Sequence, residues 1–132
     1  MQELTALAAT LRWFVGLFGA VCIVIALAHI VFGPAAIPGA VQVNATMDSE
    51  DRFYATLFLG FGAALIWAAQ ELAARRGVFL ALLAVFFLGG IARILSWLAV
   101  GPPVPLFVFL GALELAMPPV LWAWHRRVHP SR

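Results

Sequence analysis

Residues 87–100, FLGGIARILSWLAV, form an apolar stretch that carries a single charge, Arg93. An arginine at membrane depth costs from about 3 to about 15 kcal/mol, so it needs an anion, a water-filled cavity or a route to the lipid headgroups. The only carboxylate placed as deeply in an apolar stretch is Glu114, in the stretch that follows. We therefore expect the other segments to pack around an Arg93–Glu114 pair.

Composition identifies the class of protein. Of the 132 residues, 64% are hydrophobic and 11% are charged, whereas a soluble domain has roughly 25% charged residues. We therefore interpret residues 1–132 as one integral membrane domain. All the basic charge comes from arginines, and apart from Arg93 these flank apolar stretches instead of forming a basic stripe, which argues against nucleic acid as a partner. The single cysteine, Cys22, excludes an internal disulfide.

Four apolar stretches have the length of membrane spans: 11–32, 53–74, 78–100 and 105–124. A helix of that length reaches about 30 Å, which is the thickness of the hydrocarbon core. The first stretch exceeds the roughly 7–15 apolar residues of a signal peptide, so we expect it to be retained. The predicted fold is all-α, an integral membrane four-helix bundle of up-down-up-down topology.

Arginine distribution predicts the orientation of this bundle. In a four-span arrangement only Arg52 falls on one side, and the other arginines that flank the spans fall on the opposite side. These are Arg12, Arg75, Arg76, Arg126, Arg127 and Arg132. By the positive-inside rule both termini are expected in the cytoplasm, in a multi-pass protein of the inner (plasma) membrane.

Small and polar residues recur at helical spacing in each of the four spans. Those of the first span are expected to form its inward face, because small residues let helices approach closely in lipid. They are Gly19, Cys22, Ala26, His29 and Gly33. In the fourth span Phe107, Gly111, Glu114 and Pro118 share a face.

Prolines interrupt the fourth span, and polar residues precede the second. Pro118 and Pro119 remove two helical N–H donors, which predicts a bend near Glu114 and free carbonyl oxygens four residues before each proline. Ser49 stands among three carboxylates at the start of the second span and is a candidate N-cap. Glu71 is spaced i,i+4 from Arg75, which predicts an ordinary ion pair.

The candidate ligand-binding residues are expected in the outer half of the membrane. Arg93 and Glu114 are predicted to meet there, and three further residues stand at or above the same level: His29, Arg52 and Tyr54. The sharper hypothesis is a polar pocket that opens outwards. The alternative is a pair that only fixes helix register. We predict no metal and no cofactor, because His29 and Glu114 lack further ligands.

Five short elements, in their order and spacing, resemble a family of small four-span bacterial membrane proteins. They are Glu50-Asp51-Arg52, LFLGFG with Gly60 and Gly62, GGIARILS with Arg93, Gly101-Pro102-Pro103, and LELAMPP with Glu114. The family is a domain-of-unknown-function family of the 4345 type. The resemblance implies that Arg52, Arg93 and Glu114 are its characteristic polar positions, and it implies no activity.

Three classes of function remain open. We favour a binding or accessory protein that holds a lipid-like or anionic ligand, or stabilises a larger membrane complex. Its partners would be membrane lipids, a second copy of the chain or that complex. A small transporter or channel is favoured by the interrupted fourth span. A membrane enzyme would have to use Glu114 as a general acid or base, since no nucleophile with its own base is found.

Overall fold

The computed structural model describes residues 1–130, which form four long helices. A short 3-10 turn, η1 (Gly33–Ala36), follows the first helix, and no strand occurs in the described residues. The long helices are α1 (Gln2–Phe32), α2 (Ala45–Gln70), α3 (Arg76–Val100) and α4 (Pro105–Val128). Each is long and apolar enough to cross a membrane. The prediction of an all-α chain with four helices of membrane length is confirmed.

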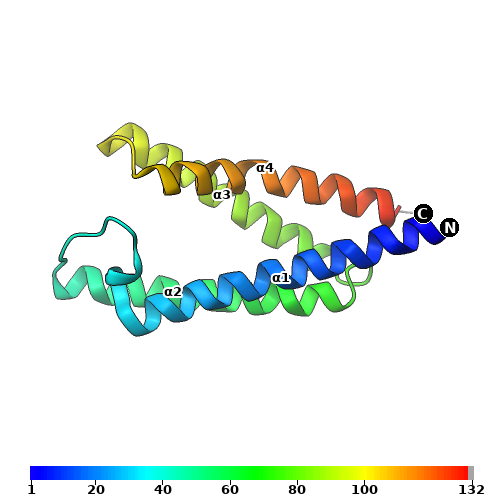
Figure 1. Cartoon of the computed structure of the whole chain (residues 1–132), viewed down its shortest axis with the longest axis horizontal. Helices are drawn as coiled ribbons and strands as arrows, with labels where there is room; N and C mark the ends of the chain where they lie inside the picture. The colour runs from blue at the N-terminus through cyan, green and yellow to red at the C-terminus, as the bar shows by residue number, and fades with distance from the viewer. Residues whose placement is uncertain (131–132) are drawn as a thin grey trace.

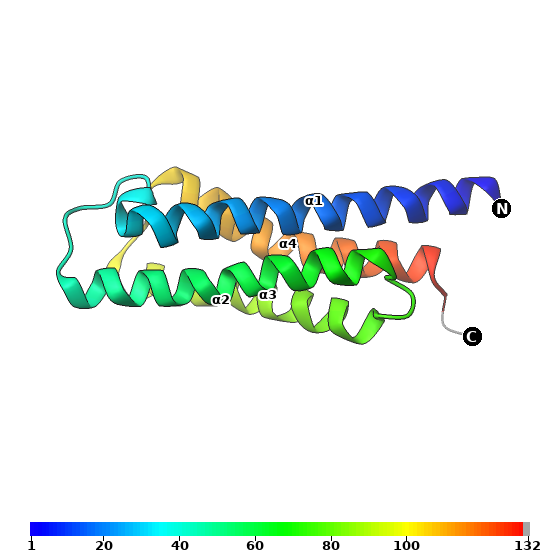
Figure 2. The same cartoon turned by 90° about the horizontal axis from the view of Figure 1, so that it is seen from below.

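The helices form two antiparallel hairpins, α1–α2 and α3–α4 (Figure 1). The start of α1 and the end of α4 lie together, at what we call the termini end, and the α1–α2 loop and α3–α4 turn lie at the opposite, loop end (Figure 2). The hairpins converge at the termini end and diverge towards the loop end (Figure 1). There, a Cβ added to Gly39 would lie 3.1 Å from a methyl carbon of Val104, so the loop contacts the turn.

Two glycines bring the backbones of α1 and α2 into contact. A Cβ on Gly19 would lie 2.6 Å from the carbonyl oxygen of Gly62, and a Cβ on Gly62 would lie 2.7 Å from that of Gly19. Only glycine allows two helices to approach so closely in lipid. Cys22 and Ala26 are buried on the same face. The predicted inward face of the first span is therefore confirmed.

The hydrophobic core lies near the termini end. Its buried members are Leu11, Val15, Cys22, Leu65, Ala68, Ala69, Leu72, Phe79, Leu83 and Leu121. The second hairpin contributes only from the beginning of α3 and the end of α4. The rings of Phe18 and Phe86, 4.9 Å apart, join the hairpins further along. The two hairpins therefore share a core over only part of their length.

The contact between α3 and α4 is of another kind. A Cβ on Gly90 would lie 2.8 Å from the side chain of Leu115, and a Cβ on Gly111 would lie 3.3 Å from Cδ of Arg93. Each glycine therefore accommodates a large side chain of the other helix. The predicted face of α4 is also confirmed, since Gly111 and Pro118 are buried there. Figure 1 shows α4 changing direction near its middle, as the prolines predict.

The beginning and end of α2 differ from prediction. It begins at Ala45, eight residues before the predicted start, and its N-cap is Asn44, whose side-chain oxygen accepts the Met47 N–H at 3.0 Å. The candidate cap Ser49 lies inside the helix. The carboxylates around Ser49 suit a helix N-terminus and therefore suggested a start beside them, but only Asp48 lies in the first turn of α2. The helix ends at Gln70, and residues 71–75 form the turn.

Candidate functional site

Arg93 of α3 and Glu114 of α4 form the charged pair of the second hairpin. Nε of Arg93 donates to Oε2 of Glu114 at 2.7 Å. The Glu114 side chain is 12% exposed and that of Arg93 is 40% exposed. Glycines make room for the carboxylate, since a Cβ on Gly89 would lie 3.9 Å from Oε2 and one on Gly90 would lie 3.2 Å from Cβ of Glu114. The two residues expected to meet therefore do so.

The guanidinium of Arg93 keeps most of its hydrogen-bonding capacity. A guanidinium has five N–H donors, and within residues 1–130 the only acceptor for Arg93 is Glu114, which receives the Nε bond. The Phe107 ring lies 5.4 Å from its Cζ and provides an aromatic face for the cation. Arg93 stands seven residues before Val100, where α3 ends, or about 10 Å along the helix. Its four remaining donors are therefore free for water or an anion.

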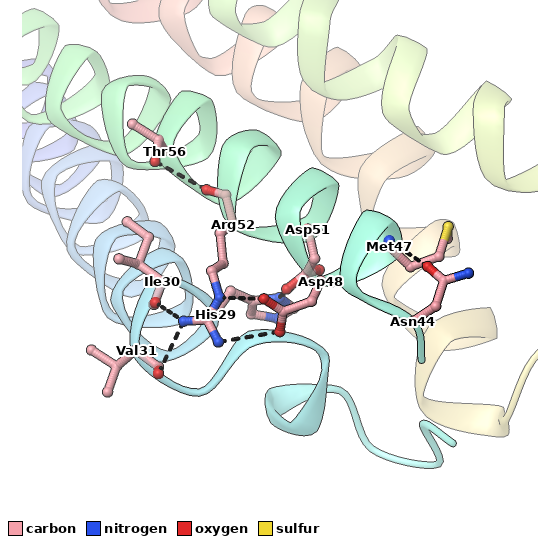
Figure 3. Close-up of polar contacts among 9 residues, drawn as sticks. All are labelled: His29, Ile30, Val31, Asn44, Met47, Asp48, Asp51, Arg52 and Thr56. Atoms are coloured by element: carbon pink, nitrogen blue, oxygen red, sulfur yellow. Dashed lines mark hydrogen bonds and ion pairs between the residues drawn. The ribbon is translucent and has the colours of Figure 1, made fainter. Parts of the chain in front are cut away.

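His29 and Asp51 form a second polar contact, between the last turn of α1 and the beginning of α2. Nδ1 of His29 lies 3.1 Å from both carboxylate oxygens of Asp51 (Figure 3). An ionised carboxylate only accepts, so Nδ1 carries the proton. The side chains are 22% and 19% exposed. The carboxylate therefore fixes the orientation of the imidazole.

Arg52 caps the C-terminal end of α1. Its Nη1 donates to the carbonyl oxygens of Ile30 at 2.5 Å and Val31 at 3.2 Å, while Nε and Nη2 donate to Asp48 at 2.8 and 3.2 Å (Figure 3). A cation suits these carbonyls because the last ones of a helix have no backbone partner. Gly33 leaves the space, since its φ is +61° and a Cβ there would lie 2.5 Å from Oδ1 of Asp48. All three nitrogens of this guanidinium are therefore engaged.

Tyr54 forms no hydrogen bond with either group in the described residues. Its side chain is exposed and its ring lies 5.5 Å from that of Phe53. We call the set formed by His29, Asp48, Asp51 and Arg52 the loop-end cluster. In residues 1–130 no hydrogen bond or ion pair joins this cluster to Arg93 or Glu114. By their contacts, the five predicted ligand-binding residues therefore do not form one site: Arg93 pairs with Glu114, His29 and Arg52 belong to the loop-end cluster, and Tyr54 contacts Phe53.

The sequence interpretation missed His125. It is 1% exposed, and its Nε2 donates to the carbonyl oxygen of Leu72 at 3.2 Å, which links α4 to the turn between α2 and α3. Nδ1 is buried and has no partner among residues 1–130. Burial and the neighbouring His125 ring lower the pKa of His129. The spacing of Pro118, Leu121 and His125 on one helical face was the available signal.

Ligands for a metal do not gather in the described chain. Across residues 1–130 no three side chains of His, Cys, Asp or Glu converge so that they could hold a metal ion. The loop-end cluster offers one imidazole, whose Nδ1 already bonds Asp51. What these residues offer chemically is therefore charge pairing and anion recognition.

Comparison with known proteins gives one match. No curated protein and no solved structure matches the chain. The family described as Domain of unknown function (DUF4345) matches residues 10–125, which include all four membrane-length helices over most of their lengths, the Arg93–Glu114 pair and the loop-end cluster. The chain belongs to this family.

Proposed function

We propose that this protein is a membrane binding or accessory protein whose α3–α4 hairpin holds a lipid-like or anionic ligand through Arg93. The observation that carries the proposal is the partial engagement of this arginine. Its side chain is 40% exposed, and only Nε has a protein acceptor within residues 1–130. A charge held in an apolar helix at this depth is costly unless an anion or water completes its shell.

The pair geometry suits an anion better than a neutral ligand. With Nε bonded to Glu114, the two terminal nitrogens of Arg93 present a planar edge. Such an edge matches two oxygens of a phosphate or carboxylate. Glu114 compensates the charge while the ligand is absent and fixes the direction of the guanidinium. In this proposal Arg93 binds the anion and Glu114 positions it.

Transport is the second candidate, and the interruption of α4 by Pro118 and Pro119 supports it. The shared core argues against a path through one copy of the chain. Leu11, Phe79 and Leu121 pack together near the termini end and are at most 1% exposed. A polar route would have to pass this apolar layer, so we favour binding.

The orientation proposed for this protein places both termini in the cytoplasm of a cell whose inner membrane the chain crosses four times. Five described arginines support it, because they stand in the first half of α1, in or beside the α2–α3 turn, or near the end of α4: Arg12, Arg75, Arg76, Arg126 and Arg127. These three segments lie at the same end of the molecule (Figure 1). A reporter fused after Arg132 is expected to be active only in the cytoplasm. Activity on the opposite side would reverse the orientation and turn Arg93 towards the inner leaflet.

Ligands retained by the purified protein test the binding proposal. Removing Arg93 alone leaves the mostly buried Glu114 unpaired, so the informative variant is Arg93→Gln with Glu114→Gln, which leaves no ion. We expect this variant to fold and to lose an anionic adduct that native mass spectrometry detects on the wild type. Ser96→Ala, one turn further along α3, is the control and should keep the adduct. An unchanged adduct on the double variant would refute the role of Arg93.

A further inference from the structure

An apolar groove lies on the surface of the second hairpin, away from Arg93. Its volume is about 540 Å³, and α3 and α4 both contribute to its walls. The lining residues are Leu80, Leu83, Ala84, Phe87, Leu88, Pro118, Pro119 and Trp122. From Leu80 to Leu88 the groove follows α3 for about 12 Å. The small Ala84 side chain and the compact proline rings leave this space between larger neighbours.

A basic hollow adjoins the groove at the end of α4. It is lined by Trp122, Ala123, Arg126 and Arg127, so Trp122 belongs to both. The Cζ of Arg126 lies 4.9 Å above the Trp122 ring. No carboxylate of residues 1–130 lies within ion-pair distance of either arginine. The apolar groove and an uncompensated cationic hollow therefore share one wall residue, Trp122.

This arrangement matches the chemistry of a charged lipid. Tryptophan is typical of the membrane–water boundary, and exposed arginines beside it attract anionic headgroups. Arg76, one helical turn before Leu80 on α3, adds a third positive charge at the same end. We propose that this groove is a binding site for an anionic phospholipid of the leaflet at the termini end. The phosphate contacts Arg126 and Arg127, and an acyl chain lies between α3 and α4.

A second copy of the chain is a poorer occupant because it lacks the complementary charge. Glu3 is the carboxylate in the first turn of α1 and Glu71 is the carboxylate in the α2–α3 turn, and Glu71 already pairs with Arg75 at 3.3 Å. A phospholipid supplies an anion and an apolar chain together. The site uses neither Arg93 nor Glu114, so the proposal is independent of the function proposed above.

Lipid retention by the full-length protein tests this site. The protein is reconstituted in phosphatidylcholine vesicles with and without phosphatidylglycerol, and native mass spectrometry counts the lipids that stay bound. We expect the wild type to retain phosphatidylglycerol selectively. Arg126→Gln with Arg127→Gln should lower the preference over phosphatidylcholine about tenfold or more. Ala84→Phe should lower retention as well, because it fills the exposed groove and leaves every charge in place.

Three comparisons distinguish a lipid bound in the groove from the alternatives. Arg12→Gln and Arg126→Gln each remove one exposed arginine, so equal losses would show general attraction to a basic surface and overturn the proposal. Loss with the arginine variants but none with Ala84→Phe would place the lipid outside the groove and also overturn it. A dimer that must dissociate before lipid is retained would assign the groove to a second copy.

Discussion

The two hairpins differ in what their glycines make room for and in how far their arginines are bonded to the protein. In the first, Gly19 and Gly62 bring the helix backbones into contact, and Arg52 uses all three of its nitrogens at the end of α1. In the second, glycines make room for side chains, and Arg93 keeps four of its five donors without a protein acceptor among residues 1–130. The first hairpin is internally satisfied, while the second retains unused binding capacity.

This difference suggests a division of labour between a scaffold and a binding element. A scaffold tolerates few changes at its contact, because two backbones cannot move apart without losing their whole interface. A binding element keeps polar groups that its own fold does not satisfy, at some cost in stability. The hairpins should therefore respond differently to substitution, and the following predictions test that contrast.

The largest effect is expected at the backbone contact of the first hairpin. Gly62→Ala places a Cβ 2.7 Å from the carbonyl oxygen of Gly19, which must push α1 and α2 apart. We expect a loss of about 3 kcal/mol in the free energy of unfolding, measured in detergent. Gly60→Ala on the same helix is the matched control, since nothing lies within 4 Å of its added Cβ. Equal effects of the two variants would contradict the proposed contact.

A double-mutant cycle at Arg93 and Glu114 should give the next largest effect. Removing one partner of a fully buried pair costs about 3–5 kcal/mol, and the 40% exposure of Arg93 reduces that figure here. Removing both, with Arg93→Met and Glu114→Gln, should restore much of the loss. We expect a coupling of at least about 1 kcal/mol from thermal unfolding. Simple addition of the single losses would mean that the observed 2.7 Å contact contributes no net coupling.

Arg52→Gln distinguishes a structural arginine from a binding one. It frees the Ile30 and Val31 carbonyls and leaves Asp48 unpaired, so the melting temperature should fall by a smaller amount than in the two preceding tests. The Arg93-dependent adduct should be retained, as measured by the same mass spectrometry. Loss of that adduct with unchanged stability would place Arg52 in the ligand site and remove the contrast between the hairpins.

Acidification should give the smallest effect. The pKa of His129 is lowered from its ordinary 6.5 in the folded chain, so the unfolded chain takes up the proton more readily. This contribution to stability is present above pH 6.5 and is lost as the pH falls through the folded-state pKa. The melting temperature should therefore fall less between pH 7.5 and pH 5.5 for His129→Gln than for the wild type, with about 6.5 as the upper limit of the transition. An identical fall would exclude His129.

Sequence reasoning predicted the features that depend on how far along an apolar stretch a residue stands, and therefore on its depth in the membrane. Helix number, the small-residue face of α1 and the meeting of Arg93 with Glu114 all follow from positions along apolar stretches. It could not predict how the helices are arranged around the bundle axis, which decides which residues at one depth are neighbours. His29 and Arg93 were expected near the same level, but the structure pairs His29 with Asp51. Depth is encoded in the order of residues, whereas lateral position depends on how helices pack.

Other differences have local causes. The N-cap was assigned to Ser49 because carboxylates surround it, whereas Asn44 has the extended backbone that a cap requires. Gly60 and Gly62 look equivalent in sequence, yet only Gly62 faces α1. His125 stood in a basic tail, where a histidine is usually solvated, but in the structure it is buried, bonded to the Leu72 carbonyl and 5.4 Å from the Phe79 ring. Each outcome depends on a contact between segments far apart in the chain.

The confinement of the shared core to the termini end has a consequence for biogenesis. The contacts between α1 and α2 are complete once residues 1–75 have left the ribosome, so the first hairpin is expected to form during synthesis, before α4 exists. The second hairpin then docks through Phe79, Leu121 and His125. Of these three residues, His125 is synthesised last. We expect the bond from His125 to the Leu72 carbonyl to mark the end of assembly, as the step that commits two separately inserted hairpins to one structure.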